Sequence, residues 1–246
     1  TYRGGLYEME LTRAAIATFA RHCSKLHLEL TGDARPELAR VLGQQPNPWM
    51  DASKFLARLA TIYMVQNNAF IVPMEDAVGR LVGYFPVLPQ QSSIREVGGE
   101  PYLLYHFWGG QSAAIELSRA GLLTQHQYED DFFGSDNRPL APTLQVMHTQ
   151  DEGIVNGIKN ATTIRFLARL AGNLKPKDID AERKRFAEDN LAGNDTGVMM
   201  FDSKYADVKQ IESTALVVNP RQQELIRQSV FSYFGTNEKI LTNTYT

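Results

Sequence analysis

The chain has 246 residues, of which 43% are hydrophobic and 22% charged, a composition typical of one large or two small globular domains. Proteins that bind DNA phosphates tightly usually carry a basic surface. The formal net charge of −3 therefore argues against tight nucleic-acid binding, and any DNA near the protein is expected to slide past it. The single cysteine, Cys23, excludes an internal disulfide and favours a reducing, intracellular origin. The sequence contains no apolar run of about eighteen residues, so no membrane-spanning helix is expected. The chain begins at Thr1, without a methionine and without a signal-peptide pattern, and we expect it to be a piece of a longer gene product.

The N-terminal part of the chain predicts two helices. Thr12 is a suitable cap for a helix over 12–27, whose apolar face would hold Ile16, Phe19, Ala20, Cys23 and His27. A loop rich in Gln, Pro and Asn follows at 43–48. Asn47-Pro48 then predicts the start of a second helix that ends near residue 66 and buries Phe55, Leu56, Leu59, Ile62 and Tyr63.

The middle of the chain predicts strands and then helices. Short apolar or aromatic runs at 69–72, 81–85 and 102–107, separated by prolines and glycines, predict an antiparallel sheet, with 90–97 as a further strand. Short helical stretches are expected at 113–120 and 124–132, and a long amphipathic helix at 150–173. The next helix, 178–191, is mostly charged, so we expect it to be solvated or to pack on polar neighbours.

Residues 193–219 predict a small β-rich insert, with apolar runs at 198–201 and 216–218 and strict alternation at 206–211. Two or three strands alone are marginal in water, so we expect the insert to bury its apolar residues against a neighbouring copy of the chain. The residues expected at that contact are Val198, Met199, Met200, Phe201, Ile211 and Leu216. Asn219-Pro220 then predicts the start of a helix that Gly235 ends.

No residue set points to catalysis, to a cofactor or to a metal. Cys23 and His27 would share a helix face, but zinc needs three or four ligands, so we interpret them as packing residues. The acids at 129–131 and Asp136 lack the spacing of a calcium loop. The sequence contains none of the common nucleotide-binding, zinc-protease or nucleophile-elbow motifs. Basic stretches at 159–169, 183–185 and 222–227 are interleaved with acidic or apolar residues and indicate solvated helix faces.

Two segments far apart in the sequence carry a resemblance to a known family. Asn47-Pro48-Trp49-Met50-Asp51 leads into a helix that ends at Asn67-Asn68-Ala69-Phe70, and Pro220–Arg227 leads through Phe234-Gly235 into 237–241. In that order, with support from 131–134 and 193–218, the chain resembles the portal proteins of tailed bacteriophages, in particular the small portal family of long-tailed phages, over about residues 12–243.

The resemblance implies an α+β fold with a defined order of domains. A wing of helices and antiparallel strands would occupy 1–177, an outgoing stem helix 178–192, a clip 193–219, and a returning stem helix 220–246 that leads toward a tunnel loop. The long helix and crown of the family would lie beyond this chain. Residues implied to lie on the stem or in the channel are Arg183, Lys184, Arg185, Glu188, Arg221, Glu224 and Arg227.

The function that the resemblance implies is structural and not enzymatic. The chain would be a subunit of the portal ring, the head-to-tail connector of a phage or prophage virion, through which double-stranded DNA is packaged and ejected. The partners implied are further copies in a dodecamer, the terminase, the major capsid or scaffold protein, head-completion proteins and double-stranded DNA bound non-specifically, with assembly in the host cytoplasm and no cofactor or membrane. The alternative from another class is an intracellular enzyme or regulatory domain with a carboxylate site among Glu129–Asp136.

Overall fold

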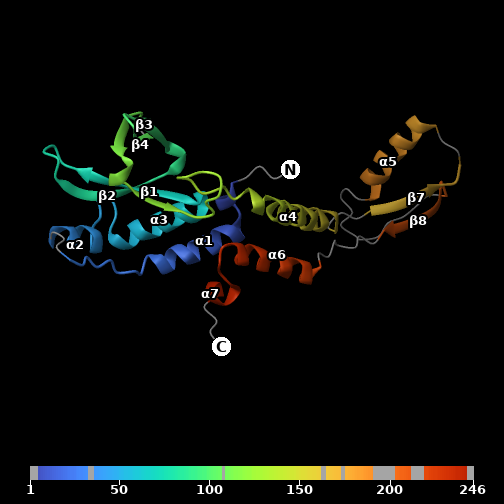
Figure 1. The fold of residues 1–246 in the computed structure, drawn as a ribbon. Helices are drawn as coiled ribbons and strands as arrows, with labels where there is room; N and C mark the ends of the chain where they lie inside the picture. Colours follow the sequence, from blue (N-terminus) through green and yellow to red (C-terminus); the bar gives the residue numbers. More distant parts are fainter. Residues whose placement is uncertain are drawn as a thin grey trace. The chain divides into compact units, whose positions relative to one another are not determined.

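The computed structural model describes residues 5–32, 36–106, 109–161, 165–172, 175–190, 203–211 and 219–242 (Figure 1). The chain divides into two compact units: unit 1 is formed by Thr1–His148 together with Asn219–Thr246, and unit 2 by Thr149–Val218. The first boundary between the units, between His148 and Thr149, falls inside helix α4 (Ala141–Ala161). These divisions differ from the expected wing boundary at 177/178, because the charged helix predicted at 178–191 belongs to unit 2.

Unit 1 contains a group of helices with one shared apolar core. Its helices are α1 (Glu10–Cys23), α2 (Pro36–Gly43), α3 (Ala52–Gln66), α6 (Pro220–Tyr233) and α7 (Glu238–Thr242), with 3-10 turns at Leu6–Glu8, Pro89–Gln91, Leu117–Arg119 and Arg138–Leu140. Residues from the two ends of the chain meet here, because Ile16 of α1 packs with Met64 of α3, Leu144 of α4, and Val230 and Phe231 of α6. The core therefore joins the returning helix α6 to the N-terminal part of the chain.

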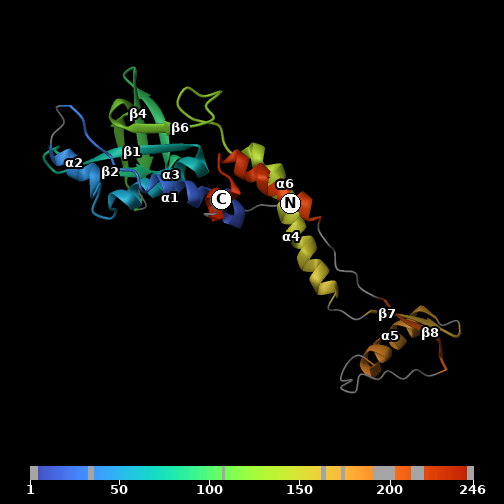
Figure 2. The same cartoon turned by 90° about the horizontal axis from the view of Figure 1, so that it is seen from below.

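Two three-stranded antiparallel sheets form the rest of unit 1 (Figures 1 and 2). The first has the order β2-β1-β6 and the second the order β3-β4-β5. Their strands are β1 (Asn68–Glu75), β2 (Leu81–Val87), β3 (Ser92–Val97), β4 (Glu100–His106), β5 (Ser112–Glu116) and β6 (Gly121–Thr124). Phe70 and Val72 of β1 pack against Leu103 and Tyr105 of β4, so the core of the sheets lies between them. Phe55 and other residues of α3 cover the opposite side of β1 and β2.

Unit 2 consists, in the residues described, of a hairpin and one helix. Strand β7 (Arg165–Leu170) pairs antiparallel with β8 (Tyr205–Ile211), and α5 (Pro176–Asn190) lies between them in sequence. Phe186 of α5 is buried and meets Tyr205 of β8 edge to face, with ring centroids 5.5 Å apart. Aromatic pairs of this kind stabilise a contact beyond the area that they bury.

Several predicted elements are confirmed. The strands predicted near 69–72, 81–85, 90–97 and 102–107 correspond to β1, β2, β3 and β4, and the helix predicted at 178–191 corresponds to α5. The strand at 206–211 corresponds to β8. The Asn219-Pro220 start is also confirmed, because the Asn219 side chain accepts a hydrogen bond of 3.0 Å from the Arg221 backbone N–H. Gly235, at φ +63°, follows the end of α6 in the left-handed conformation that glycine favours.

Other predicted elements are wrong. The helical stretches expected at 113–120 and 124–132 are instead strand β5, a 3-10 turn, strand β6 and a loop, because pairing with β4 and β1 overrides local preference. The helix expected at 150–173 begins at Ala141 and ends at Ala161, and 165–170 forms β7. The second helix starts at Ala52 with Asp51 as its cap, so Asn47 is not a cap. The runs at 198–201 and 216–218 lie outside the described residues.

Candidate functional site

The segment Pro46–Met50, the first of the resemblance motifs, is attached to the edge of strand β2. The backbone N–H of Tyr84 donates to the Pro46 carbonyl at 2.7 Å, and the Asn47 side-chain amide donates to the Tyr84 carbonyl at 3.0 Å. The Asn47 side chain also accepts a bond of 3.1 Å from the Trp49 backbone N–H. Gly83 is required beside this contact, since a Cβ there would lie 2.4 Å from the Pro46 oxygen. The motif therefore fixes the loop that carries Trp49.

The end of the first resemblance segment, Asn67-Asn68, lies at a junction of three parts of the chain. Asn67 is fully buried and ends α3 with φ +57°. Its side-chain oxygen accepts a bond of 2.7 Å from the Gln125 amide, and its side-chain nitrogen donates to the Ser135 carbonyl at 2.6 Å. Asn68 and Gly134 exchange two bonds, at 3.0 and 2.7 Å. These contacts join the end of α3 to the 125–135 loop.

Helix α6 is linked to the same junction. The Tyr233 hydroxyl donates to the Asn137 side-chain oxygen at 2.7 Å, and that oxygen also accepts from Asn67 at 3.0 Å. The Asn137 nitrogen donates to the Val65 carbonyl at 2.9 Å. Burial of the Tyr233 ring, assisted by the nearby Asp136 charge, raises the pKa of its hydroxyl, so it stays protonated as a donor. The sequence did not predict the roles of Gln125, Asn137 and Tyr233. Gln125 is 58 positions from its partner Asn67, and Tyr233 is 96 positions from Asn137, and no local sequence pattern indicates contacts between residues so far apart.

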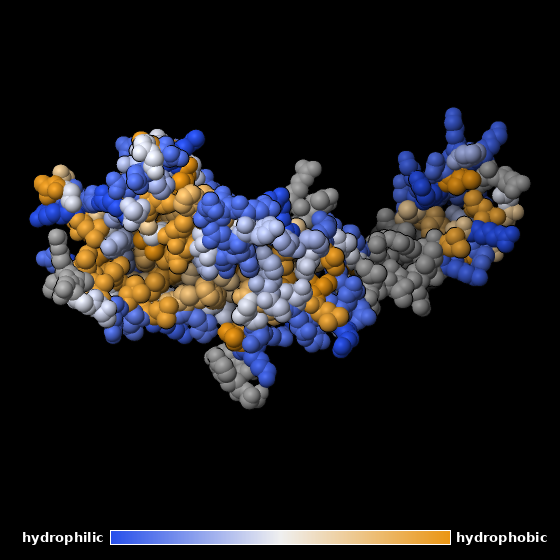
Figure 3. Space-filling model, in the orientation of Figure 1, coloured by the Kyte–Doolittle hydropathy of each residue, from blue (hydrophilic) through white to orange (hydrophobic). Residues whose placement is uncertain are grey.

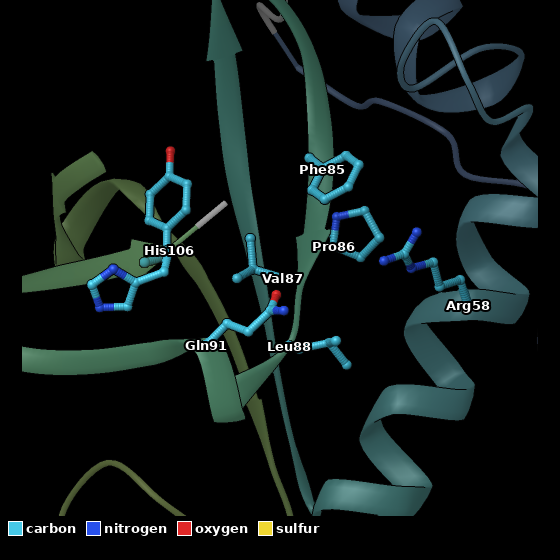
Figure 4. Close-up of a pocket in the computed structure, with 8 residues that line it drawn as sticks. Arg58, Phe85, Pro86, Val87, Leu88, Gln91 and His106 are labelled. Atoms are coloured by element: carbon cyan, nitrogen blue, oxygen red, sulfur yellow. The ribbon is translucent and has the colours of Figure 1, made fainter. Parts of the chain in front are cut away.

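An apolar pocket, here called the Arg58 pocket, lies between α3, the Trp49 loop and strands β1, β2 and β4. It has a volume of about 580 Å³ and is lined by Trp49, Met50, Arg58, Val72, Pro73, Met74, Glu75, Phe85 and Tyr105. A second hollow of about 300 Å³ shares Arg58, Phe85 and Tyr105 and extends toward His106 (Figure 4). In Figure 4 the Arg58 side chain reaches from its helix toward Phe85 and Pro86. Figure 3 shows further apolar surface gathered on the visible face of unit 1.

The predicted stem residues on α5 pair mainly within that helix. Arg183 lies 3.3 Å from Asp180 and Arg185 lies 3.4 Å from Asp189, and all four side chains are exposed. Such pairs stabilise a helix by only about 0.3–0.5 kcal/mol each. The other two predicted residues of α5, Lys184 and Glu188, are exposed as well.

A second set of contacts on α5 holds it to β8. The Glu182 carboxylate accepts bonds from the Lys204 ammonium at 2.6 Å and the Tyr205 hydroxyl at 2.8 Å. These two bonds, the Lys204 bond first, hold the pKa of Glu182 below its ordinary value. The charged helix is therefore packed against the hairpin of its own unit.

The predicted channel residues on α6 are exposed. Arg227 pairs with Glu238 at 3.4 Å, and Glu224 accepts a bond of 3.2 Å from Gln228. Arg221 contributes its backbone N–H to the Asn219 cap. Of the residues predicted at the clip contact, Val198, Met199, Met200, Phe201 and Leu216 lie outside the described residues, and Ile211 is the last residue of β8.

The histidine and acid clusters do not assemble a reactive site in the part of the chain that is described. Helix α1 ends at Cys23, so His27 lies beyond it and the two residues do not share a helix face. Burial raises the pKa of the Cys23 thiol. The Asp130 carboxylate accepts from the backbone N–H groups of Phe132 and Phe133, which lowers its pKa. Among the described residues no group of three His, Cys, Asp or Glu side chains is placed to hold a metal ion. Over the same residues, no helix is long and apolar enough to cross a membrane.

Comparison with known proteins gives one family and several similar folds. The family model described as "Phage portal protein" matches residues 11–246. The neck of a native gene transfer agent particle, solved with C12 symmetry, contains a chain that matches with a TM-score of 0.71 at 14% identity, over 98% of this chain and 70% of that one. An HK97-family phage portal protein from Corynebacterium diphtheriae matches with a TM-score of 0.57 at 14% identity, over 96% of this chain and 75% of that one. No curated protein matches the sequence.

Proposed function

Because the chain belongs to the phage portal protein family, we propose that it forms a ring at one capsid vertex through which double-stranded DNA is packaged and ejected. The observation that carries the proposal is the family match over 11–246, and the fold supports it over 98% of the chain. The family is one of structural proteins, so its role is to assemble and not to catalyse. The neck structure solved with C12 symmetry supports a ring of twelve copies.

The order of elements supports a revised assignment of the family's domains. The chain leaves unit 1 within α4 and returns to it at α6, with unit 2 between them. We therefore propose α4 and α6 as the stem helices, unit 1 as the wing, and unit 2 as the clip. This replaces α5 as the outgoing stem, because Glu182 and Phe186 bind α5 to β8 within unit 2.

The charge of the chain suits a conduit for DNA. The net charge is −3, and the bases Arg183 and Arg185 of α5 and Arg227 of α6 are each paired with an acid. With a net negative charge and these bases paired, the surface would attract the phosphate groups of passing DNA only weakly, and counterion release, which drives tight DNA binding, would be small. DNA would move past such a surface without being held.

The proposed position of the protein at the capsid vertex implies its binding partners. A ring at the capsid vertex would contact the capsid or scaffold protein, receive the terminase during packaging, and then bind head-completion proteins. Double-stranded DNA would be bound weakly and without sequence preference.

Native mass spectrometry of the purified protein tests the proposal. We expect a discrete species with twelve times the subunit mass, since closed cyclic assembly gives one preferred stoichiometry. A protein that remains monomeric at every concentration up to about 100 µM, well above the dissociation constants of specific complexes, would contradict the proposal.

A further inference from the structure

The Arg58 pocket has aromatic walls and an open mouth at the edge of a sheet. It is lined by Phe85 of the edge strand β2 and by Val72 to Glu75 of β1, which lie beyond the stretch of β1 that pairs with β6. Trp49 is 65% exposed and meets Phe85 edge-on, with ring centroids 6.1 Å apart. A hollow of about 580 Å³ is large enough for several side chains. Exposed aromatic surface of this kind marks a binding site for another molecule.

The pocket also carries a positive charge. The Arg58 guanidinium lies 5.3 Å from the centre of the Phe85 ring, and within the described parts of the chain Arg58 forms no ion pair. The carboxylate among the lining residues, Glu75, is bound by Arg119 instead. The charge of Arg58 thus stays available to a ligand. The pocket fits an occupant that presents an aromatic ring next to a carboxylate.

The chain itself exposes such a segment in the loop 127–133, here called the Tyr128 loop. Tyr128 is 87% exposed, and Glu129 and Asp131 beside it are exposed too. Neither acid forms an ion pair within the part of the chain that the structure describes. The loop therefore presents an aromatic ring flanked by carboxylates, the chemistry that complements Arg58 and the rings around it.

The Tyr128 loop is held in one shape. The Gln127 side-chain amide donates to the carbonyls of Asp130 and Asp131 at 3.0 and 2.7 Å. The Asp130 carboxylate accepts from the backbone N–H groups of Phe132 and Phe133 at 2.7 and 2.9 Å. A loop that is ordered before binding loses little conformational entropy when it docks.

The pocket and the loop lie at opposite ends of strand β1. The pocket is lined by Val72 to Glu75, which form the C-terminal end of β1. The loop follows β6, whose last residue, Thr124, pairs with Asn68 at the N-terminal end of β1. A cyclic ring requires two different, complementary surfaces on opposite sides of each subunit. We infer that the Tyr128 loop of one copy docks into the Arg58 pocket of the next copy, with Tyr128 against Phe85 and a neighbouring carboxylate on Arg58. This inference rests on the proposed ring.

Disulfide cross-linking tests this contact directly. In a protein whose only native thiol is removed by Cys23→Ser, the pair Met74→Cys and Tyr128→Cys should give a ladder of covalent multimers on a non-reducing gel after mild oxidation. Met74 lies at the C-terminal end of β1, whereas the Tyr128 loop lies beyond the N-terminal end of that strand, so the two cysteines can bridge only between copies. The matched control pairs Tyr128→Cys with Val78→Cys, an exposed site that does not line the pocket, and should give no ladder.

Rings without a ladder above the Val78 control would overturn the docking and leave the proposed ring intact. A chain that forms no rings before any substitution would overturn both. The experiment therefore distinguishes failure of the docking contact from failure of the proposed ring.

Charge reversal tests the same contact through assembly. Arg58→Glu should raise the concentration needed for half-assembly at least about tenfold, and adding Glu129→Arg and Asp131→Arg should restore it. Arg95→Glu, at an exposed base on β3, is the matched control and should have no effect. An Arg58→Glu protein that assembles like the control, or a triple variant that gains nothing over Arg58→Glu, would overturn the inference.

Discussion

Gly134 is the position at which a single added methyl group should disturb unit 1 most clearly. An ideal Cβ at this residue would lie 1.8 Å from the Gln125 carbonyl oxygen and 3.0 Å from the Asn67 carbonyl oxygen. Both are backbone atoms, so no side chain can rotate away to make room. Gly134→Ala must therefore move the 125–135 loop relative to the end of α3.

The structure allows the size of the effect to be worked out. Overpacking of this kind costs about 1–3 kcal/mol. The displacement also breaks the two bonds that Asn68 and Gly134 exchange, and a buried polar group left without a partner costs about 1–3 kcal/mol. Together the loss is about 2–6 kcal/mol, and at about 2–4 °C per kcal/mol the unfolding midpoint of unit 1 should fall by roughly 4–24 °C.

Thermal unfolding followed by circular dichroism measures this shift. Gly109→Ala is the control, because an added Cβ there meets no heavy atom within 4 Å. Both variants restrict the unfolded chain alike, an effect worth about 0.4–1 kcal/mol, so the difference between them isolates the clash. If Gly134→Ala unfolds within about 2 °C of the Gly109→Ala control, a shift of no more than about 1 kcal/mol, the reasoning about this junction fails.

Three further predictions concern unit 2, assembly and DNA. Because the folded-state pKa of Glu182 is lowered, its contribution to stability is present at neutral pH and is lost progressively as the pH falls below the ordinary value of 4.5 and through the lowered folded-state pKa. The difference in unfolding midpoint between wild type and Glu182→Gln should therefore be clear at pH 7 and shrink as the pH falls below 4.5, and a difference that stays constant with pH would contradict this. Replacing the three bases of α5 (Arg183, Lys184 and Arg185) together by Glu should leave the subunit folded by circular dichroism but weaken ring formation, more so at low salt, and normal rings at low salt would refute this. Affinity for double-stranded DNA in about 150 mM salt should be micromolar or weaker and independent of sequence, and nanomolar binding to one sequence would refute this.

Short sequence patterns correctly predicted the elements that depend on interactions between residues close together in the chain. Asn219-Pro220 starts α6 because its side chain and proline ring act within one turn of the helix. The alternation of 206–211 correctly predicted β8. Asn47-Pro48 has the same local form but does not start a helix, because the Asn47 amide bonds to Tyr84, 37 positions away. The dipeptide alone does not distinguish the two cases.

The remaining elements and the pocket depend on distant pairing. The run at 112–116 forms β5 only because β4 lies beside it, and 165–170 forms β7 because β8 returns to pair with it. The Arg58 pocket combines α3, the Trp49 loop and three strands, and none of these segments carries a pattern of its own. The resemblance to portal proteins, by contrast, came from the order of short motifs, and the family match over 11–246 confirms it.

Single-particle electron microscopy of the purified protein tests the central claim most directly. The proposal predicts closed rings around a continuous channel, with α4 and α6 of every subunit placed as stem helices and unit 2 at one end of the ring. Isolated subunits, or open oligomers without a channel, would contradict it.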